Sequence, residues 1–128
     1  MAGFIVTGNS PKRVLIRGVG PGLGAYGVTG VLTNPRIQLF NADENIVARN
    51  DDWGTADPVF TGQRIAPASE IETTNGIVGA FSLDTGSADS AMVLTLAPGT
   101  YTVHLDAGTT GLTGNALIEV YEIPDVDP

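Results

Sequence analysis

Glycine and proline occur so often in this chain that few long helices are expected. Seventeen glycines and eight prolines punctuate its 128 residues, and six of those glycines together with Pro21 fall between Gly18 and Gly30. Each glycine inside a helix costs about 1 kcal/mol relative to alanine, so no stable helix is expected across that stretch. The sequence therefore predicts short strands joined by turns, with an irregular crossover at residues 18–30.

The segments between the turns have the composition and alternation of strands. In residues 100–106, Tyr, Val and Leu alternate with Thr, His and Asp, which is typical of a half-buried strand. The expected strands are residues 4–7, 12–17, 36–40, 46–49, 77–83, 91–96, 100–106 and 115–123. At most one helical turn is expected, at 69–72, ended by residues 73–76. We predict one all-β domain over residues 1–123, an antiparallel, jelly-roll-like β-sandwich of seven to eight short strands, with a linker starting at 124–128.

The net charge of the chain limits the classes of binding partner that can be expected. Fourteen acidic against six basic residues give a formal charge of −8. Nucleic acids and anionic membrane surfaces are both disfavoured, because each requires a basic protein surface. No apolar run approaches the roughly 20 residues of a membrane-spanning helix. With no cysteine present, disulfides, thiolate metal sites and cysteine nucleophiles are excluded.

Six short segments together resemble a known kind of module: residues 3–6, 13–17, 20–23, 50–53, 97–102 and 116–122. They look like a β module found, often in tandem, near the C-termini of large secreted or surface proteins of environmental bacteria. The second half is similar to bacterial pre-peptidase C-terminal (PPC-like) domains, which share the Asn-Asp-Asp loop and the Pro-Gly-Thr-Tyr turn. The resemblance implies export, neighbouring modules in the parent chain, no catalysis, and calcium or polysaccharide contact.

The start of the chain departs from that pattern. Related modules carry a further segment before Gly3, which we expect to pair with the sheet. Residues 1–4 have neither the basic region nor the long apolar region of a signal peptide, so an exported chain would be a piece of a longer protein. Without the leading segment one sheet edge is left open, and we predict a homo-oligomer through that edge.

Acidic residues gather in two neighbouring loops and suggest calcium, which prefers hard oxygen ligands. Asp43 lies in the turn at 41–45, and Asp51, Asp52 and Asp57 follow the next strand. The turn imitates the opening of a helix–loop–helix calcium loop, but Ile46 stands where glycine is required and the twelfth position is not glutamate. Two interpretations stay open: a solvated turn with an acidic loop, or a β-sandwich calcium site that uses Asp51 or Asp52 with backbone carbonyls, Asp43 being the third candidate.

The sequence lacks complete motifs for nucleotide binding and for catalysis. Gly20-x-Gly22-x-x-Ala25 follows a strand, as a dinucleotide fingerprint does, but the glycines beyond it forbid the required helix. His104 is the only histidine, and its alternation places it on a solvent-facing strand surface. No Gly-x-Ser-x-Gly nucleophile motif occurs. We therefore expect no enzymatic activity.

Trp53 is the only tryptophan, and it lies beside two carboxylates. Sugar-binding modules use exposed aromatic rings, whereas a domain of this size needs most of its few aromatic residues for packing. Trp53 therefore either closes the edge of the core or faces a ligand. The ligand-facing interpretation supports the alternative function, a carbohydrate-binding module stabilised by calcium.

Arg17 and Glu119 are charges placed among apolar strand positions. Arg17 shares its strand face with Leu15, and Glu119 sits between Leu117 and Tyr121. A buried charge is tolerated only when it is paired, because removing it from water costs several kcal/mol. Either the two residues form a buried ion pair, or this face is a solvent-exposed stripe.

Overall fold

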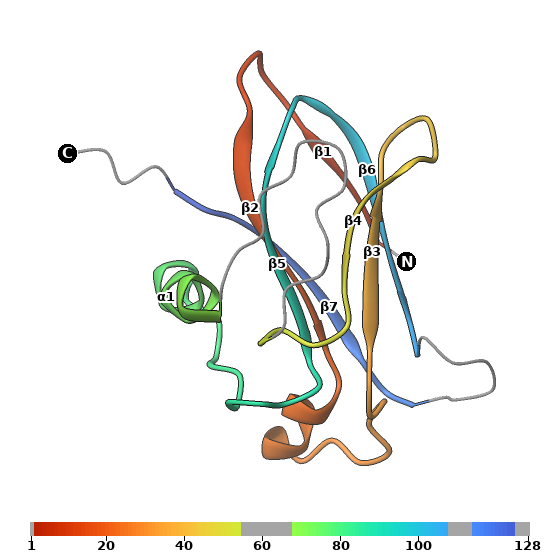
Figure 1. Ribbon diagram of the computed structural model, residues 1–128, viewed down its shortest axis with the longest axis vertical. Coiled ribbons are helices and arrows are strands. Elements are labelled where there is room, and N and C mark those ends of the chain that lie inside the picture. The colour runs from red at the N-terminus through yellow and green to blue at the C-terminus, as the bar shows by residue number, and fades with distance from the viewer. Residues whose placement is uncertain (1, 55–67, 108–113, 125–128) are drawn as a thin grey trace.

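Two antiparallel sheets packed face to face make up most of the molecule (Figure 1). The computed structural model describes residues 2–54, 68–107 and 114–124. Within these residues, one sheet has the order β1-β6-β3-β4 and the other the order β5-β2-β7. The strands are β1 (Ala2–Val6), β2 (Lys12–Val19), β3 (Arg36–Phe40), β4 (Ile46–Asn50), β5 (Ser90–Leu96), β6 (Gly99–Asp106) and β7 (Leu117–Glu122). The predicted all-β sandwich is confirmed, with seven strands in the described part of the chain.

The main core lies between the two sheets and follows from the alternation along each strand. On β2, Val14 and Ile16 point inward, as do Tyr101 and Val103 on β6. These residues join the remaining members of the inner cluster: Val6, Ile37, Leu39, Ala48, Met92, Leu94 and Leu96. Burying such side chains contributes about 25 cal/mol per Å² of apolar surface, so this layer stabilises the packing of the two sheets.

A helix occupies part of the chain for which a strand was expected. α1 (Ala68–Val78) runs through residues 73–76, which were predicted to end it, and takes in the start of the strand expected at 77–83. The rest of that segment forms no strand either, so this predicted strand is wrong. The hydroxyls of Thr73 and Thr74 donate to the carbonyls four residues earlier, at 3.0 and 2.8 Å. Ile71 is buried against the sandwich, and Gly79, with φ +77°, ends the helix. Tertiary packing thus outweighs a weak local helix propensity.

α1 covers the outer face of the three-stranded sheet and creates a second core (Figure 1). Its buried members are Leu15, Val19, Trp53, Ile71, Leu83, Ala91, Val93 and Ile123. The outer face of the four-stranded sheet is exposed at His104, whose ring lies 4.9 Å from that of Phe40. The described helices include none long and apolar enough to cross a membrane. The molecule is therefore layered as sheet, sheet and helix.

Candidate functional site

The register of β2 and β7 places Arg17 directly opposite Glu119. The guanidinium Nε of Arg17 lies 3.0 Å from Oε1 of Glu119; the Arg17 side chain is 0% exposed and that of Glu119 is 15% exposed. The structure therefore brings the two predicted partners together. The alternative of a solvent-exposed stripe is wrong for Arg17 and Leu15, because α1 and residues 79–83 cover this face of the sheet.

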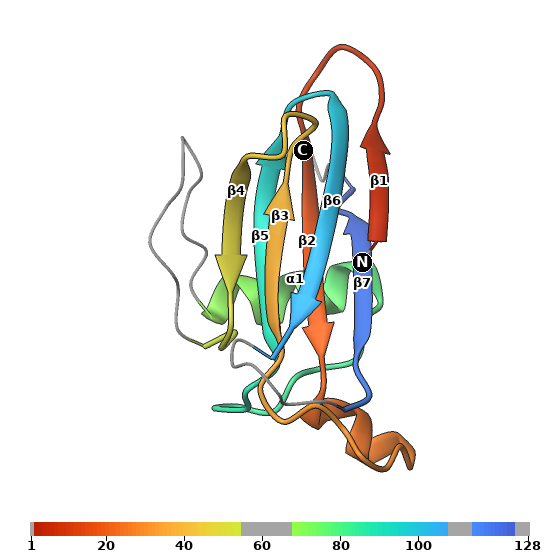
Figure 2. The same cartoon turned by 90° about the vertical axis from the view of Figure 1, so that its right-hand side faces the viewer.

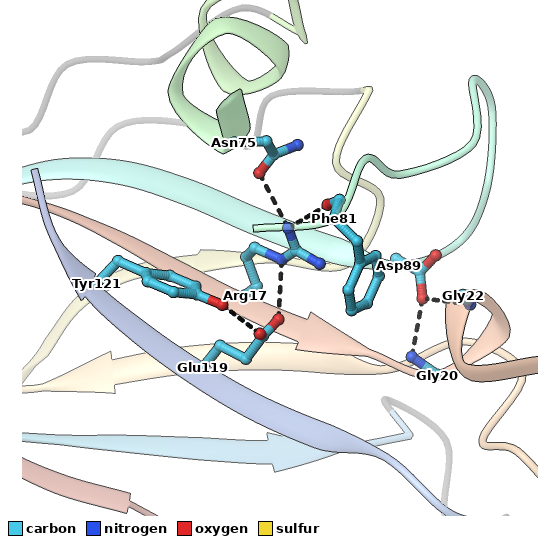
Figure 3. Close-up of polar contacts among 8 residues, drawn as sticks. All are labelled: Arg17, Gly20, Gly22, Asn75, Phe81, Asp89, Glu119 and Tyr121. Atoms are coloured by element: carbon cyan, nitrogen blue, oxygen red, sulfur yellow. Dashed lines mark hydrogen bonds and ion pairs between the residues drawn. The ribbon is translucent and has the colours of Figure 1, made fainter. Parts of the chain in front are cut away.

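Arg17 also contacts the helical layer (Figure 3). Its Nη1 donates to the backbone carbonyl of Phe81 at 2.7 Å and to Oδ1 of Asn75 in α1 at 3.1 Å. The guanidinium carbon lies 4.4 Å from the centroid of the Phe81 ring, a cation–π distance. One buried side chain thus joins β2, β7, α1 and the segment after α1. We refer to Arg17, Asn75, Phe81, Glu119 and Tyr121 as the arginine cluster.

Charge, more than hydrogen-bond geometry, holds the Arg17–Glu119 pair. Nε of Arg17 and Oε1 of Glu119 are at ion-pair distance, but the N–H is not aligned for a hydrogen bond. The Tyr121 hydroxyl donates to Oε2 of Glu119. Burial, and then this contact with Glu119, raises the pKa of Tyr121. Among the described residues, Nη2 of Arg17 and Nδ2 of Asn75 have no hydrogen-bond partner. The cluster is suited to holding elements together.

Asp89, at the end of the loop before β5, is a second buried charge (Figure 3). Its Oδ1 accepts the backbone N–H of Gly20 at 2.8 Å and that of Gly22 at 3.1 Å. Its Oδ2 accepts the hydroxyl of Ser87 at 2.9 Å. The carboxylate therefore fixes the start of the short 3-10 helix η1 (Pro21–Tyr26) against the end of the three-stranded sheet.

The glycines at this point are required by close approach. A Cβ at Gly20 would lie 2.0 Å from the carbonyl oxygen of Leu32, and one at Gly22 would lie 3.1 Å from Oδ2 of Asp89. The Gly-x-Gly pattern therefore provides backbone N–H donors for the buried carboxylate of Asp89. Sequence reasoning missed Asp89. The signal available was an acidic residue placed immediately before an apolar strand, downstream of a glycine-rich turn.

Trp53 does not face a ligand. It is 2% exposed and belongs to the core beneath α1. Its ring Nε1 donates to the backbone carbonyl of Asp84 at 3.1 Å, and its backbone N–H donates to the backbone carbonyl of Asp89 at 2.8 Å. The predicted ligand-facing role is wrong, because a ring buried on all sides offers no surface for stacking. Trp53 instead closes the core edge. Among the phenylalanine, tyrosine and tryptophan residues that the structure describes, Tyr26 is the most exposed, at 62%, and its ring lies 4.9 Å from that of Phe81.

The three aspartates predicted to hold calcium do not form one site. Asp43 lies in the β3–β4 turn, whereas Asp51 and Asp52 follow the far end of β4. A five-residue strand spans roughly 17 Å, so one ion cannot bind at both ends. No group of three potential metal-ligating side chains occurs in residues 2–54, 68–107 and 114–124. Asp57 lies outside these ranges.

The turn that holds Asp43 is built by an asparagine. Oδ1 of Asn41 accepts the backbone N–H groups of Asp43 and Asn45, both at 3.0 Å. Glu44, with φ +62°, adopts the left-handed conformation that the turn requires. The amide oxygen of Asn41 is thus already used by the backbone, as expected for an Asx turn.

Asp51 and Asp52 remain as the acidic pair after β4. Partial burial, and then repulsion from Asp51, raises the pKa of Asp52. Asp51 also helps to raise the pKa of Arg36, although the larger cause is the hydrogen bond that Arg36 donates to Asp106. The Arg36–Asp106 pair is bidentate, at 3.0 and 2.9 Å. A cationic side chain therefore already balances part of this acidic surface.

A calcium titration tests the surviving part of the metal hypothesis. If Asp51 and Asp52 bind calcium, a tenfold excess over Kd should add about 1.4 kcal/mol of stability by mass action. Thermal unfolding in chelator and in millimolar calcium measures this effect. Asp43→Asn, at the other end of β4, should keep the full calcium response. An equal Tm in chelator and in calcium would contradict the hypothesis, as would loss of the response in Asp43→Asn.

The raised pKa of Asp52 leads to a second prediction, which concerns thermal stability in the absence of calcium. Because the pKa is raised on folding, the contribution of Asp52 to stability is present below the unfolded pKa and is lost as the pH rises through the folded pKa. Asp52→Asn should therefore raise the Tm at neutral pH in chelator, and should abolish any increase produced by calcium.

Comparisons with family models, curated proteins and solved structures found no match to this chain.

Proposed function

We propose that this chain is a non-catalytic structural module of a secreted or cell-surface bacterial protein, with a role in spacing, anchoring or assembly. The proposal is supported mainly by the contacts that the buried charged side chains of this chain make. Arg17 and Asp89 are each 0% exposed, and both join separate elements of the fold. Side chains committed in this way resist separation of the layers, which suits a module that transmits load.

The positions of the chain ends also support a spacing role. β1 begins in the four-stranded sheet, and the chain after β7 leaves on the side of the molecule where α1 lies (Figure 1). Neighbouring modules can therefore be attached at different layers of the sandwich. Export and tandem neighbours come from the resemblance of segments such as residues 13–17 and 97–102 to bacterial surface modules.

Single-molecule pulling on tandem copies of this chain tests the mechanical role. Each copy should unfold in one discrete event that lengthens the tether by roughly 40 nm, the extended length of the chain less its folded size. Glu119→Gln should lower the unfolding force, because β7 then loses its charged contact with Arg17. Glu122→Gln, on the same strand but 66% exposed, is the control and should not. Gradual lengthening without discrete events would contradict the proposal.

A carbohydrate-binding role is the second candidate, favoured by the exposure of Tyr26. Its ring is supported from one side by Phe81, which in turn lies against buried Arg17. Aromatic rings held in this way, with one apolar surface free, are typical of ligand contacts. Retention on cellulose or chitin that Tyr26→Ala abolishes, without a change in Tm, would favour this candidate over the mechanical role.

A further inference from the structure

β1 forms one edge of the four-stranded sheet, and β7 forms the edge of the other sheet on the same side (Figure 2). On the opposite side the edges are joined, because the backbone N–H of Ala91 in β5 donates to Oδ1 of Asn50 in β4 at 3.1 Å. On the β1 side the sandwich is less closed. Val120 shares the inner face of β7 with Ile118, yet it is 36% exposed.

β1 lacks the devices that usually protect an edge strand. Charged side chains, prolines and bulges discourage pairing with another chain, and the sequence Ala-Gly-Phe-Ile-Val of β1 has no charge and no proline. Its pairing with β6 runs in unbroken register from Ala2 to Val6. In contrast, a bulge interrupts the β3–β4 pairing at Leu39 and Phe40, beside the other edge of this sheet.

β1 itself carries no charged side chain, although the chain has a net charge of −8. The two acidic residues of β7 are both matched by cations: Glu119 by Arg17 at 3.0 Å, and Glu122 by Lys12 at 3.7 Å. Two copies that approach through this side therefore bring together little unbalanced charge. Most other faces of so acidic a protein repel their own kind.

We propose that β1 pairs antiparallel with β1 of a second copy, about a two-fold axis at Phe4, to give one continuous sheet across both copies. This proposal rests on the assembly role proposed above and names its partner. An antiparallel pair is compatible with two-fold symmetry, so each copy offers the other the same edge of β1, which pairs only with β6 among the described strands. A symmetric pairing also closes on itself and limits the assembly to two copies.

The side chains of β1 fit this register. With Phe4 opposite Phe4 of the second copy, Ile5 lies opposite Gly3 of that copy on the outer face. Ile5 is 67% exposed, and a Cβ built at Gly3 meets no atom closer than 3.8 Å, so the large side chain falls over an open position. On the inner face, Phe4 of the second copy lies toward the half-exposed Val120. The pairing thus covers two of the exposed apolar residues on this side, Ile5 and Val120.

Sedimentation velocity over a concentration series tests the association. The chain should convert reversibly from monomer to dimer. Ile5→Lys should weaken dimerisation by at least about tenfold, because it places two like charges diagonally across the pair. Ile77→Lys, a matched change at a 43% exposed position of α1, should leave dimerisation unchanged. Only monomer at high concentration, or equal effects of the two lysines, would overturn the proposal.

Cysteine cross-linking tests the register, since the natural chain has no cysteine. Gly3→Cys and Ile5→Cys chains, mixed under mild oxidation, should form a covalent heterodimer, because opposed residues place their Cα atoms within disulfide range. Each variant alone should link far less. Equal linking in the separate samples, or none in the mixture, would overturn the register. A monomeric chain that still unfolds in discrete mechanical events would refute the pairing and leave the spacing role intact.

Discussion

Glu119→Gln should lower the free energy of unfolding by about 3 kcal/mol, the lower end of what breaking a buried ion pair costs. The substitution leaves the Arg17 guanidinium charged and 0% exposed, without its counter-charge. The lower end applies because Glu119 is itself 15% exposed, so water can reach part of the site. For a chain of this size, a loss of 3 kcal/mol corresponds to a fall in Tm of roughly 10 °C.

Chemical denaturation measures this loss, and the same strand supplies the control. Glu122 pairs with Lys12 at 3.7 Å, but both side chains are largely in solvent. Exposed pairs contribute at most about 1 kcal/mol, so Glu122→Gln should change stability little. If the two glutamine variants were equally stable, the Arg17–Glu119 pair would not be an energetically important contact.

Removing both charges should be less harmful than removing one. Arg17→Met with Glu119→Leu leaves no unpaired ion, and apolar replacements of buried ion pairs are often neutral. Here the recovery should be partial, because Nη1 of Arg17 also serves the carbonyl of Phe81 and Oδ1 of Asn75. A double variant less stable than Glu119→Gln alone would contradict the pairing of Arg17 with Glu119.

The Arg17–Glu119 contact could be predicted because the alternation along each strand shows which face of the sheet each residue occupies. Arg17 and Glu119 sit on strands whose apolar neighbours fix which face is which, and a buried charge needs a partner. The seven described strands could be found for the same reason, since each is a short apolar run between turns. Local pattern was not sufficient at residues 77–83, an apolar run after Asn75 and Gly76 that begins in α1 and forms no strand.

The helix could not be predicted, because its stability comes from the sheet that it covers. Residues 73–76 read Thr-Thr-Asn-Gly, a poor helical sequence, yet Thr74 and Asn75 are each 2% exposed on the buried face of α1. Trp53 illustrates the same point: whether an aromatic ring beside two aspartates is buried depends on a layer that only the folded chain supplies. Asp89 was missed because its donors, Gly20 and Gly22, lie almost 70 residues away in the chain.

Asp89→Ala should be as damaging as any single change at the arginine cluster, at about 3–5 kcal/mol. Three donors lose their acceptor together: the N–H groups of Gly20 and Gly22, and the Ser87 hydroxyl. A hydrogen bond to a charged group contributes about 1.5–3 kcal/mol, and a buried donor left without a partner adds its own cost. Asp89→Asn keeps one acceptor oxygen and should lose only about 1–2 kcal/mol.

Asp84→Ala is the matched control, because Asp84 lies in the same loop and is exposed. It should leave stability unchanged, since the contact it makes with Trp53 uses its backbone carbonyl. Hydrogen exchange provides a local measurement. In Asp89→Ala the amides of Gly20 and Gly22 should exchange faster, while those of the β2–β5 ladder keep protection up to the new global stability. Unchanged exchange at the two glycines would show that Asp89 does not hold the start of η1. A uniform loss over both sheets would mean that the loop and the sandwich unfold as one unit.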